Sequence, residues 1–533
     1  MAFNAQYISY KNTNSFSKLS VDYVEKNPAL LPYYQHEVSE EGVKKAIEEK
    51  SKQPVDRALL VSTLKSQYTS VSTNADVDAN IELLLQHNSY TICTAHQPNI
   101  FTGHLYFIYK ILHVIKLAKT LQASMPAYHF IPVYYMGSED ADLEELGAVY
   151  AGGKHYNWQT RQTGAVGRML VDDDLLKIKT QLAGLLKALP HGEEILAKLD
   201  KAYMKGVTIQ QATFTLLHDL FKQYGLVVLI ADNAALKAAF LPIANKEIEQ
   251  SFSNTALQHT IAQFPAQYKV QTQGRPINLF YIEGDKRERI ERLSNNISVV
   301  NTDLTQSIDA FKKTIAANPA LISPNVILRP LYQELILPNI IFVGGGGELA
   351  YWLELKSVFA AATIPMPMMV LRNSFSILSA KTSVFIQQLN IDLTSLFKSE
   401  TDILNLLVEK NAEKELTISS QKLALLKTYS QIRDVATTVD PTLQKHVWAL
   451  QQEAVNKLQQ LEKKMWRAAR KQLEDEKNKI HAIKNNLFPE GILQERIENV
   501  LWYYAKYGAE FLEEIFTCSQ GLAQQYCILT ESK

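Results

Sequence analysis

The sequence predicts an α/β protein whose core is a doubly wound parallel sheet, followed by an α-helical coiled-coil domain. From about residue 90 to 375, short apolar runs alternate with segments of helical periodicity, which is the order of a doubly wound sheet. The run Leu226-Val-Val-Leu-Ile230 is apolar at consecutive positions, as in a strand covered on both faces. After about residue 380 only helical periodicity remains. A chain of 533 residues is long enough for roughly two to four domains.

Composition and charge exclude several classes of protein. The 55 basic and 55 acidic side chains cancel, which argues against a role in coating nucleic acid or a membrane surface. The three cysteines, Cys93, Cys518 and Cys527, lack metal-ligand spacing and suit a reducing cytosol. The N-terminus has no signal-peptide pattern, and no window approaches the ~20 apolar residues of a membrane span. We therefore expect a cytoplasmic protein without nucleic-acid or membrane partners.

The expected core covers residues 86–379, preceded by a helical lead-in over residues 1–85 in which Asn27–Tyr34 is an extended link. Helical insertions near 165–222 and 285–325 interrupt the alternation of strand and helix. The expected strands are Tyr90–Thr94, Phe130–Tyr135, Leu226–Ala231, Asn278–Ile282 and Ile340–Val343, and the expected core helices are His104–Thr120, Asp140–Ala148, Ala234–Phe252 and Glu348–Ala361.

Residues 380–487 are expected to form a helical coiled-coil hairpin. Two heptad series, one from Ile418 and one from Leu443, flank a turn that contains Pro441, and the second helix is expected to run to about Asn485. Small and polar residues occupy several positions of the heptad seam, so a second subunit would help to bury it. A homodimer through the coiled coil follows as an expectation, with residues 488–533 returning to the core as a helical segment.

The first candidate site is the loop between the first expected strand and its helix. His96, Gln97, Asn99, Gly103 and His104 gather there, where backbone N–H groups and a helix dipole attract anions. The spacing of His96 and Gly103-His104 looks like a stretched His-x-Gly-His signature of nucleotidyl-transferring enzymes. The alternative is a polar loop whose histidines satisfy buried carbonyl groups.

The second candidate site is an acid cluster after the strand Phe130–Tyr135. Glu139, Asp140 and Asp142 are close enough in sequence to bind Mg²⁺ or a substrate ammonium, or to provide a general base. Acidic residues also suit the first turn of a helix, so capping is the alternative.

The third candidate site is a glycine loop, Gly344, Gly345, Gly346 and Gly347, followed by Glu348. Four glycines let the backbone approach a ligand closely, although the loop is neither a P-loop nor a dinucleotide fingerprint. The alternative is a flexible turn.

The fourth candidate site comprises Arg329, Gln333 and Glu334, where the guanidinium could bind a carboxylate or phosphate. A structural Arg–Glu pair explains the same residues. The basic run Lys463–Lys471 is expected to be a solvated face of the coiled coil.

Five ordered blocks together resemble a known family, the bacillithiol biosynthesis cysteine-adding enzymes, also called BshC or cysteine ligase. The blocks are Phe101-Thr-Gly-His-Leu-Tyr with Lys110, Pro132-Val-Tyr with Glu139-Asp140-x-Asp142, Asn325-Val-x-x-Arg-Pro with Gln333-Glu334, Gly344-Gly-x-x-Glu348-x-Ala-Tyr-Trp352, and Leu487-Phe-Pro with Leu493-Gln-Glu-Arg496.

The resemblance implies a Rossmann-like core with two connecting-peptide insertions and a dimerising coiled coil. It also implies the joining of cysteine to the amine of glucosaminyl malate, the last step of bacillithiol synthesis. Family members often have His where this chain has Ala141. Many have Gln-Gln and Gly-Pro where this chain has His96-Gln97 and Gly103-His104.

The mechanism expected is formation of an amide through an activated carboxylate, with ATP and Mg²⁺ as plausible cofactors and the metal ligands left open. The catalytic residues expected are His96, His104, Glu139, Asp140 and Asp142. The substrate- or nucleotide-binding residues expected are Gln97, Asn99, Gly103, Tyr106, Lys110, Arg329, Gln333, Glu334, Gly344, Gly345, Gly346, Gly347, Glu348 and Tyr351. A nucleotidyltransferase acting on another small molecule and a non-catalytic dimeric nucleotide-binding scaffold are the alternatives.

Overall fold

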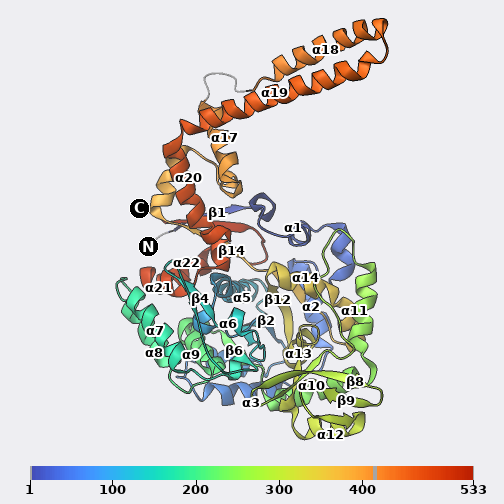
Figure 1. Cartoon of the computed structure of the whole chain (residues 1–533). Helices are drawn as coiled ribbons and strands as arrows, with labels where there is room; N and C mark the ends of the chain where they lie inside the picture. The colour runs from blue at the N-terminus through green and yellow to red at the C-terminus, as the bar shows by residue number, and fades with distance from the viewer. Residues whose placement is uncertain (1–2, 412–416, 532–533) are drawn as a thin grey trace. The chain divides into compact units, whose positions relative to one another are not determined.

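The computed structural model describes residues 3–411 and 417–531. The chain forms two compact units, one containing the residues up to Ser376 together with Leu493–Leu529, and the other containing Ile377–Ile492 and the residues from Thr530. The first unit carries the sheet domain and the second carries the helical hairpin (Figure 1).

A five-stranded parallel sheet forms the centre of the first unit. Its order is β13-β12-β2-β3-β6, and every neighbouring pair is parallel. Four of these strands confirm the expected positions, whereas β13 was not expected. Their bounds are β2 (Ser89–His96), β3 (His129–Met136), β6 (Val227–Ile230), β12 (Asn339–Gly344) and β13 (Met368–Leu371).

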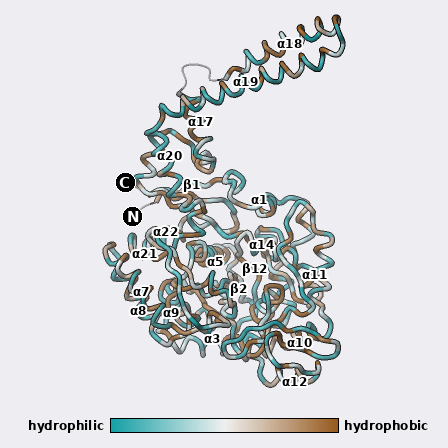
Figure 2. The backbone as a smooth tube through the Cα atoms, in the orientation of Figure 1, coloured by the Kyte–Doolittle hydropathy of each residue, from teal (hydrophilic) through white to brown (hydrophobic). Residues whose placement is uncertain are grey.

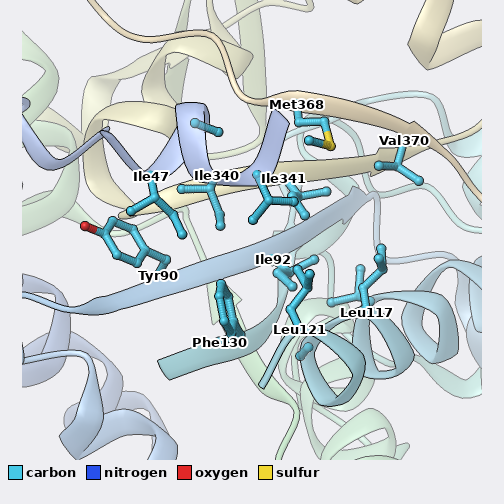
Figure 3. Close-up of a cluster of buried hydrophobic side chains, with 14 of the residues drawn as sticks. Ile47, Tyr90, Ile92, Leu117, Leu121, Phe130, Ile340, Ile341, Met368 and Val370 are labelled. Carbon is cyan, nitrogen blue, oxygen red and sulfur yellow. The ribbon is translucent and has the colours of Figure 1, made fainter. Parts of the chain in front are cut away.

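The core strands are buried at consecutive positions, as their apolar runs predict. All the residues of β6, β12 and β13 are buried, so both faces of the sheet are covered. Helix α5 (Leu105–Ser124) packs on β2 and β3, and α2 (Glu40–Ser51) packs on β12. Figure 3 shows the resulting cluster, in which residues of both helices meet residues of the strands, among them Ile47, Ile92, Leu117, Leu121 and Ile340.

The strand order creates a switch point between β2 and β12. From β2 the chain proceeds outward through β3 to β6, and it then crosses to β12 and β13 on the other side of β2. Loops that follow two such strands diverge and leave a crevice at their carboxyl ends. The loop after β2 and the glycine loop after β12 therefore border the same crevice.

Helices account for the first insertion and for most of the lead-in. Three helices of the first insertion confirm its helical character, and a short β-hairpin, β4 (Ala148–Ala151) and β5 (Lys154–Asn157), precedes them. The segment Asn27–Tyr34 is not extended, because Pro28–Tyr33 forms a 3-10 helix. The helices are α1 (Lys18–Val24), α3 (Arg57–Tyr68), α4 (Ala75–Leu83), α7 (Asp173–Leu186), α8 (Gly192–Ala202) and α9 (Ile209–Phe221).

The second insertion differs from its expected helical character. The expected strand Asn278–Ile282 exists as β7 (Leu279–Glu283), but it belongs to a separate antiparallel sheet of order β10-β9-β8-β7-β11. One α-helix, α12 (Ile308–Ala317), and a short 3-10 helix, Pro319–Leu321, lie in the segment expected to be mostly helical. Six of the eight residues of β8 are charged, so this strand lacks the apolar run or the apolar–polar alternation by which a strand is recognised. The other strands are β8 (Lys286–Leu293), β9 (Asn296–Val299), β10 (Thr305–Ser307) and β11 (Ile322–Pro324).

Three expected helices have different bounds. The helix expected at Asp140–Ala148 is reduced to α6 (Leu143–Leu146), since the acids before it form a loop. The helix expected at Ala234–Phe252 ends at Gln250, and α11 (Phe252–Gln263) follows it. The helix expected at Glu348–Ala361 divides into α14 (Gly346–Glu354) and α15 (Lys356–Ala362). Helices α10 (Ala234–Gln250) and α13 (Arg329–Ile336) complete this part of the unit.

The second unit contains the helical hairpin. Helices α18 (Ser419–Val439) and α19 (Leu443–Lys471) pair along the predicted seam, with Pro441 in the turn between them. The second helix does not continue to Asn485, because it is interrupted before α20 (Glu474–Leu487). Hydrophobic positions run along both helices of the hairpin in Figure 2. Helices α16 (Ala380–Leu389) and α17 (Glu400–Asn411) complete the unit.

The C-terminal segment is helical and ends in a strand. Helices α21 (Val500–Tyr507) and α22 (Glu510–Cys518) precede β15 (Tyr526–Glu531), which lies between β1 (Phe3–Ile8) and β14 (Ser374–Leu378) in a three-stranded sheet. In the described residues, no helix is long and apolar enough to cross a membrane.

His113 of α5 gives the first unit a predicted pH dependence. Its Nδ1 accepts the Asn373 backbone N–H at 3.1 Å, so its Nε2 carries the proton and donates to the Gly521 carbonyl at 2.9 Å. Burial lowers the pKa of His113 from 6.5 to about 4. The unfolded chain therefore binds more protons between these two values, and the stability that neutral His113 contributes is lost as the pH falls from 6.5 towards 4.

We expect this one histidine to remove about 2 kcal/mol of unfolding free energy between pH 7 and pH 5. Urea unfolding of the wild type and of His113→Gln at both pH values measures the effect, because the variant lacks the titrating group. Equal pH dependence in the two proteins would contradict the prediction.

Candidate active site at the carboxyl edge of the parallel sheet

A cavity of about 770 Å³ lies at the switch point of the sheet. Residues after β2, β3 and β12 form one part of its wall, and the second insertion forms another. Five arginines line it against three carboxylates, which makes it a cationic cavity, and two histidines also line it. The lining residues are Ala95, His96, Gln97, His104, Tyr106, Gly137, Asp140, Glu145, Gln273, Arg275, Phe280, Arg287, Asn325, Val326, Arg329, Gly345, Gly346, Gly347, Glu348, Tyr351, Arg372 and Arg496.

Glu348 and Lys110 hold the glycine loop against the loop after β2. The Gly345 N–H donates to Oε2 of Glu348 at 2.8 Å, and Lys110 Nζ donates to the same oxygen at 2.7 Å. Lys110 also donates to the Ala95 carbonyl at 2.6 Å. Burial lowers the pKa of Lys110, although Glu348 opposes this effect. Lys110 does not line the cavity, so the structure makes it a tie between the two loops and not a substrate contact.

The glycine loop also requires glycine for a close approach. A Cβ atom on Gly346 would lie 2.6 Å from Oγ of Ser20 in α1, so the lead-in packs directly on the loop. Gly345, Gly346 and Gly347 line the cavity, whereas Gly344 is buried as the last residue of β12.

The loop after β2 is strained and clamped. Phe101, Thr102 and Gly103 all have positive φ angles, of 51°, 73° and 62°, which is costly for a β-branched residue. Asn499 Nδ2 donates to the Phe101 carbonyl at 2.8 Å and to the Gly103 carbonyl at 2.5 Å. The Phe101 N–H donates to the Tyr203 hydroxyl at 2.7 Å. The C-terminal segment and the first insertion therefore impose this conformation.

Two residues of that loop do not reach the cavity. The Gly103 carbonyl is occupied by Asn499, and Asn99 is buried with its Nδ2 3.4 Å from the Glu145 carbonyl. Neither residue lines the cavity, so the close approach of a phosphate to Gly103 is not supported.

Both histidines line the cavity, and both favour the neutral form. Burial, together with the positive charge of Lys110, holds the pKa of His96 well below its usual value. Its buried Nε2 has no hydrogen-bond partner among the described residues. Burial also lowers the pKa of His104, whose Nδ1 lies 3.1 Å from the Ile497 carbonyl. Nδ1 must therefore carry the proton, which leaves Nε2 of His104 as a proton acceptor.

The acid cluster divides into three separate roles. Glu139 is buried and forms an ion pair with Lys237, which also binds Asp232 at 2.7 Å. Burial raises the pKa of Glu139. Asp142 is exposed and caps α6 by accepting the Glu145 N–H at 3.1 Å. Neither of the two lines the cavity.

Of the expected acid cluster, Asp140 is the residue that lines the cavity. Its Oδ2 accepts the Gln97 side-chain amide at 3.2 Å and lies 3.9 Å from the Arg329 guanidinium. Burial raises its pKa, but the Arg329 charge and the Gln97 hydrogen bond outweigh burial and lower the pKa overall. The expected convergence of three carboxylates is therefore wrong. Across residues 3–411 and 417–531, no three His, Cys, Asp or Glu side chains are grouped to hold a metal ion.

Arg329 and Arg287 bring two like charges to the cavity wall. Arg329 begins α13, and Arg287 of β8 stacks 3.8 Å from the centre of the Phe280 ring. Burial and the neighbouring Arg329 charge lower the pKa of Arg287 to about 10. A bound anion between the two guanidinium groups would offset the repulsion between their positive charges. The sequence did not reveal Arg287, because its segment was expected to be helical.

Gln333 and Glu334 lie away from the cavity and are structural. Glu334 Oε1 accepts hydrogen bonds from the side chains of Gln333 at 2.9 Å and Asn339 at 2.8 Å. Its Oε2 lies 3.6 Å from Lys50 Nζ. All four side chains are buried. The structural alternative for Glu334 is therefore supported, with Lys50 as its partner instead of Arg329.

Arg372, after β13, is a cavity residue that the sequence did not single out. Its guanidinium donates two hydrogen bonds to Glu495, from Nη1 to Oε2 at 2.9 Å and from Nη2 to Oε1 at 2.7 Å. Its guanidinium lies 5.3 Å from the centre of the Tyr106 ring. The block Leu493-Gln-Glu-Arg496 contains its partner Glu495, and Arg496 of the same block also lines the cavity. This block was the signal in the sequence that could have pointed to Arg372.

Residues 3–373 match the family described as "Bacillithiol biosynthesis BshC, N-terminal Rossmann-like domain". Residues 375–531 match "Bacillithiol biosynthesis BshC, C-terminal coiled-coil domain". The chain belongs to the BshC family. The Rossmann-like core and the coiled-coil domain expected from the sequence are thereby confirmed.

Curated members of the BshC family resemble the chain over its whole length. A protein of Flavobacterium psychrophilum is 38% identical, with 98% of each chain covered, and one of Flavobacterium johnsoniae is 36% identical, with 98% of this chain and 99% of the relative covered. A protein of Cytophaga hutchinsonii is 35% identical, with 97% of each chain covered. All three are named "Putative cysteine ligase BshC".

Proposed function

We propose that this chain is a carbon–nitrogen bond-forming ligase that adds L-cysteine to the amine of glucosaminyl malate in the last step of bacillithiol biosynthesis. The names of its relatives support the reaction class and the amino acid. The observation that carries the proposal for the site is the arginine-lined cavity at the switch point, because glucosaminyl malate and cysteine both bear carboxylates.

In this proposal Arg287 and Arg329 bind the malyl carboxylates. Both guanidinium groups line the cavity, and burial together with the nearby Arg329 charge lowers the pKa of Arg287. Asp140 orients Arg329 and is the acid nearest to that guanidinium. Glu139, Asp142, Gln333 and Glu334 receive no substrate role, because they do not line the cavity.

The proposed reaction needs an activated cysteine carboxylate and a neutral amine. We propose ATP as the activating donor, with its phosphates near the N–H groups of Gly346 and Gly347 at the N-terminus of α14. The amine nitrogen of the sugar attacks the activated carbonyl carbon, the bond to the leaving phosphate or nucleotide breaks, and the amine loses a proton. Nε2 of His104 accepts that proton. Neutral His96 lies beside Tyr106 and contributes polar contact within the cavity.

Incubating the protein with glucosaminyl malate, L-cysteine and ATP tests the proposal, with mass spectrometry to detect bacillithiol. Reactions without ATP and with heat-denatured protein are the controls. A nucleotidyltransferase would release a nucleotidylated small molecule without bacillithiol, and a non-catalytic scaffold would leave all reactants unchanged. Either result would contradict the proposal.

Replacing His104 with alanine is expected to lower kcat by about 10²–10³, because the proposed proton acceptor is lost. The matched control is His87→Ala, a change at an exposed histidine outside the cavity. Steady-state assays of both variants measure the effect. Unchanged kcat in His104→Ala would remove this residue from the mechanism.

We also propose a homodimer formed through the hairpin. Several apolar residues of α18 remain exposed, including Leu423 at 69%, Val435 at 66% and Val439 at 78%. Packing against the hairpin of a second subunit would bury these apolar side chains and stabilise the pair of hairpins. A cytoplasmic location accompanies the proposal, since it keeps the free thiols of the chain reduced.

Val435→Glu is expected to dissociate the dimer, because a carboxylate would be buried without a partner. Sedimentation equilibrium at several concentrations measures the change. Thr428→Glu adds the same charge at another exposed position of α18 and should leave the dimer intact. A monomeric wild type, or a dimeric Val435→Glu variant, would place the interface elsewhere.

A further inference from the structure

Residues Gln271–Asn278 form an irregular segment, here called the strap, between α11 and β7. The strap carries Gln273 and Arg275 to the cavity, where both are exposed. The Arg275 guanidinium has no hydrogen-bond or ion-pair partner within the described part of the chain. The backbone of the strap is nevertheless held at both ends by buried carboxylates.

Glu354 holds the first end of the strap. Its Oε1 accepts the Gln271 N–H at 2.7 Å, and its Oε2 accepts the Thr272 N–H at 2.9 Å and the Thr272 hydroxyl. The Glu354 side chain is fully buried, and no Lys, Arg or His of residues 3–411 and 417–531 forms an ion pair with it. Three donors from two adjacent strap residues therefore satisfy this carboxylate.

Glu247 of α10 holds the second end through Asn278. Its Oε1 accepts the Asn278 N–H at 2.9 Å and the Ser253 hydroxyl at 2.7 Å. Asn278 Oδ1 then accepts the Arg275 N–H at 3.2 Å, and Asn278 Nδ2 donates to the Arg275 carbonyl at 3.0 Å. The backbone of Arg275 is thus fixed while its side chain stays free.

Helix α14 connects this arrangement to the glycine loop. Its first residues, Gly346 and Gly347, line the cavity, and its last residue is Glu354. One rigid helix therefore sets the spacing between the glycine loop and the strap. Burying a carboxylate without a cation is unfavourable, so its hydrogen bonds must be retained for the wall to keep this shape.

We propose that the strap is a substrate-recognition element in which Arg275 contacts a carboxylate of the sugar substrate and Glu354 and Glu247 are positioning residues. The identity of that substrate rests on the proposed function. The position of the strap does not, because it follows from the hydrogen bonds of Glu354 and Asn278.

Hydrogen–deuterium exchange of the full chain tests the positioning step without turnover. Glu354→Gln should accelerate exchange at Gln271 and Thr272, because the amide offers one acceptor oxygen in place of two. Thr272→Val, which removes only the hydroxyl bond, is a milder second variant. Adding glucosaminyl malate should protect the strap in the wild type and not in Arg275→Ala.

Steady-state kinetics test the recognition step. Arg275→Ala and Glu354→Gln should each raise KM for glucosaminyl malate about tenfold, with kcat and the KM for ATP within about twofold of wild type. Their double variant should match the single variants, since both changes remove one contact. Asp219→Asn removes a carboxylate bonded to Lys198 and Lys222, none of which lines the cavity, and should leave KM unchanged.

The outcomes separate the two proposals. Bacillithiol formation with unchanged KM in Arg275→Ala overturns the strap alone, and so do additive effects in the double variant. Absence of bacillithiol overturns the proposed function. The strap proposal is then tested by hydrogen exchange alone: protection of the strap by glucosaminyl malate supports it, and lack of protection overturns it. A rise in KM for ATP instead would assign Arg275 to phosphate and overturn its sugar-carboxylate role.

Discussion

Arg329→Gln is expected to raise KM for glucosaminyl malate about a hundredfold. A guanidinium that binds a carboxylate in a partly enclosed cavity contributes about 1.5–3 kcal/mol per charged hydrogen bond, and each 1.4 kcal/mol is tenfold in binding. Arg287 remains after this change, but the two malyl carboxylates then have one guanidinium of the pair in place of two. Initial-rate assays with glucosaminyl malate varied at saturating cysteine and ATP measure the effect.

Arg289→Gln is the matched control for that change. Arg289 lies two residues after Arg287 on β8, but it is exposed and does not line the cavity. Its replacement should leave all three KM values unaltered. Equal kinetics for Arg329→Gln and Arg289→Gln would show that the malyl carboxylates bind elsewhere.

Glu495→Gln is expected to lower the unfolding free energy of the first unit by about 3–5 kcal/mol. Arg372 and Glu495 are buried and joined by two hydrogen bonds, so removing the carboxylate charge leaves a buried guanidinium without its counter-ion. Glu495 also accepts the Phe375 N–H at 3.3 Å, which links the pair to the backbone. Urea unfolding followed by circular dichroism measures the loss.

Two comparisons make the stability result specific. Replacing both partners, as in Arg372→Met with Glu495→Leu, should cost less than Glu495→Gln alone, because no uncompensated charge remains. The exposed pair of Glu48 and Lys52 should behave differently, with Glu48→Gln leaving the unfolding midpoint unchanged. A small effect of Glu495→Gln would mean that water reaches Arg372.

Local pattern predicted most of the sheet domain correctly. The strands β2, β3, β6 and β12 were recognisable because each is a run of apolar residues that ends at polar loop residues. The antiparallel second insertion was not recognised, since six of the eight residues of β8 are charged and the strand is partly exposed. Its misassignment concealed Arg287, which lines the cavity. The strap precedes this insertion and carries no strand or helix pattern.

The candidate site was predicted in part, and two residues adjacent in the sequence show why. Glu139 and Asp140 are adjacent, yet Glu139 is buried with Lys237 while Asp140 lines the cavity beside Arg329. No periodicity distinguishes them, because their direction depends on the loop that replaces the expected helix.

The Rossmann-like core, the coiled-coil hairpin and the two loops that meet at the switch point were predictable from the sequence, because apolar spacing and glycine placement act over a few residues. Which side chains face the cavity depends on contacts between segments that are far apart in the chain. Lys110 and Glu334 are buried and pair with Glu348 and Lys50, and Arg372 pairs with Glu495, which lies 123 residues away in the chain. Desolvation and long-range pairing set these roles, and both depend on contacts that appear only when distant segments are folded together.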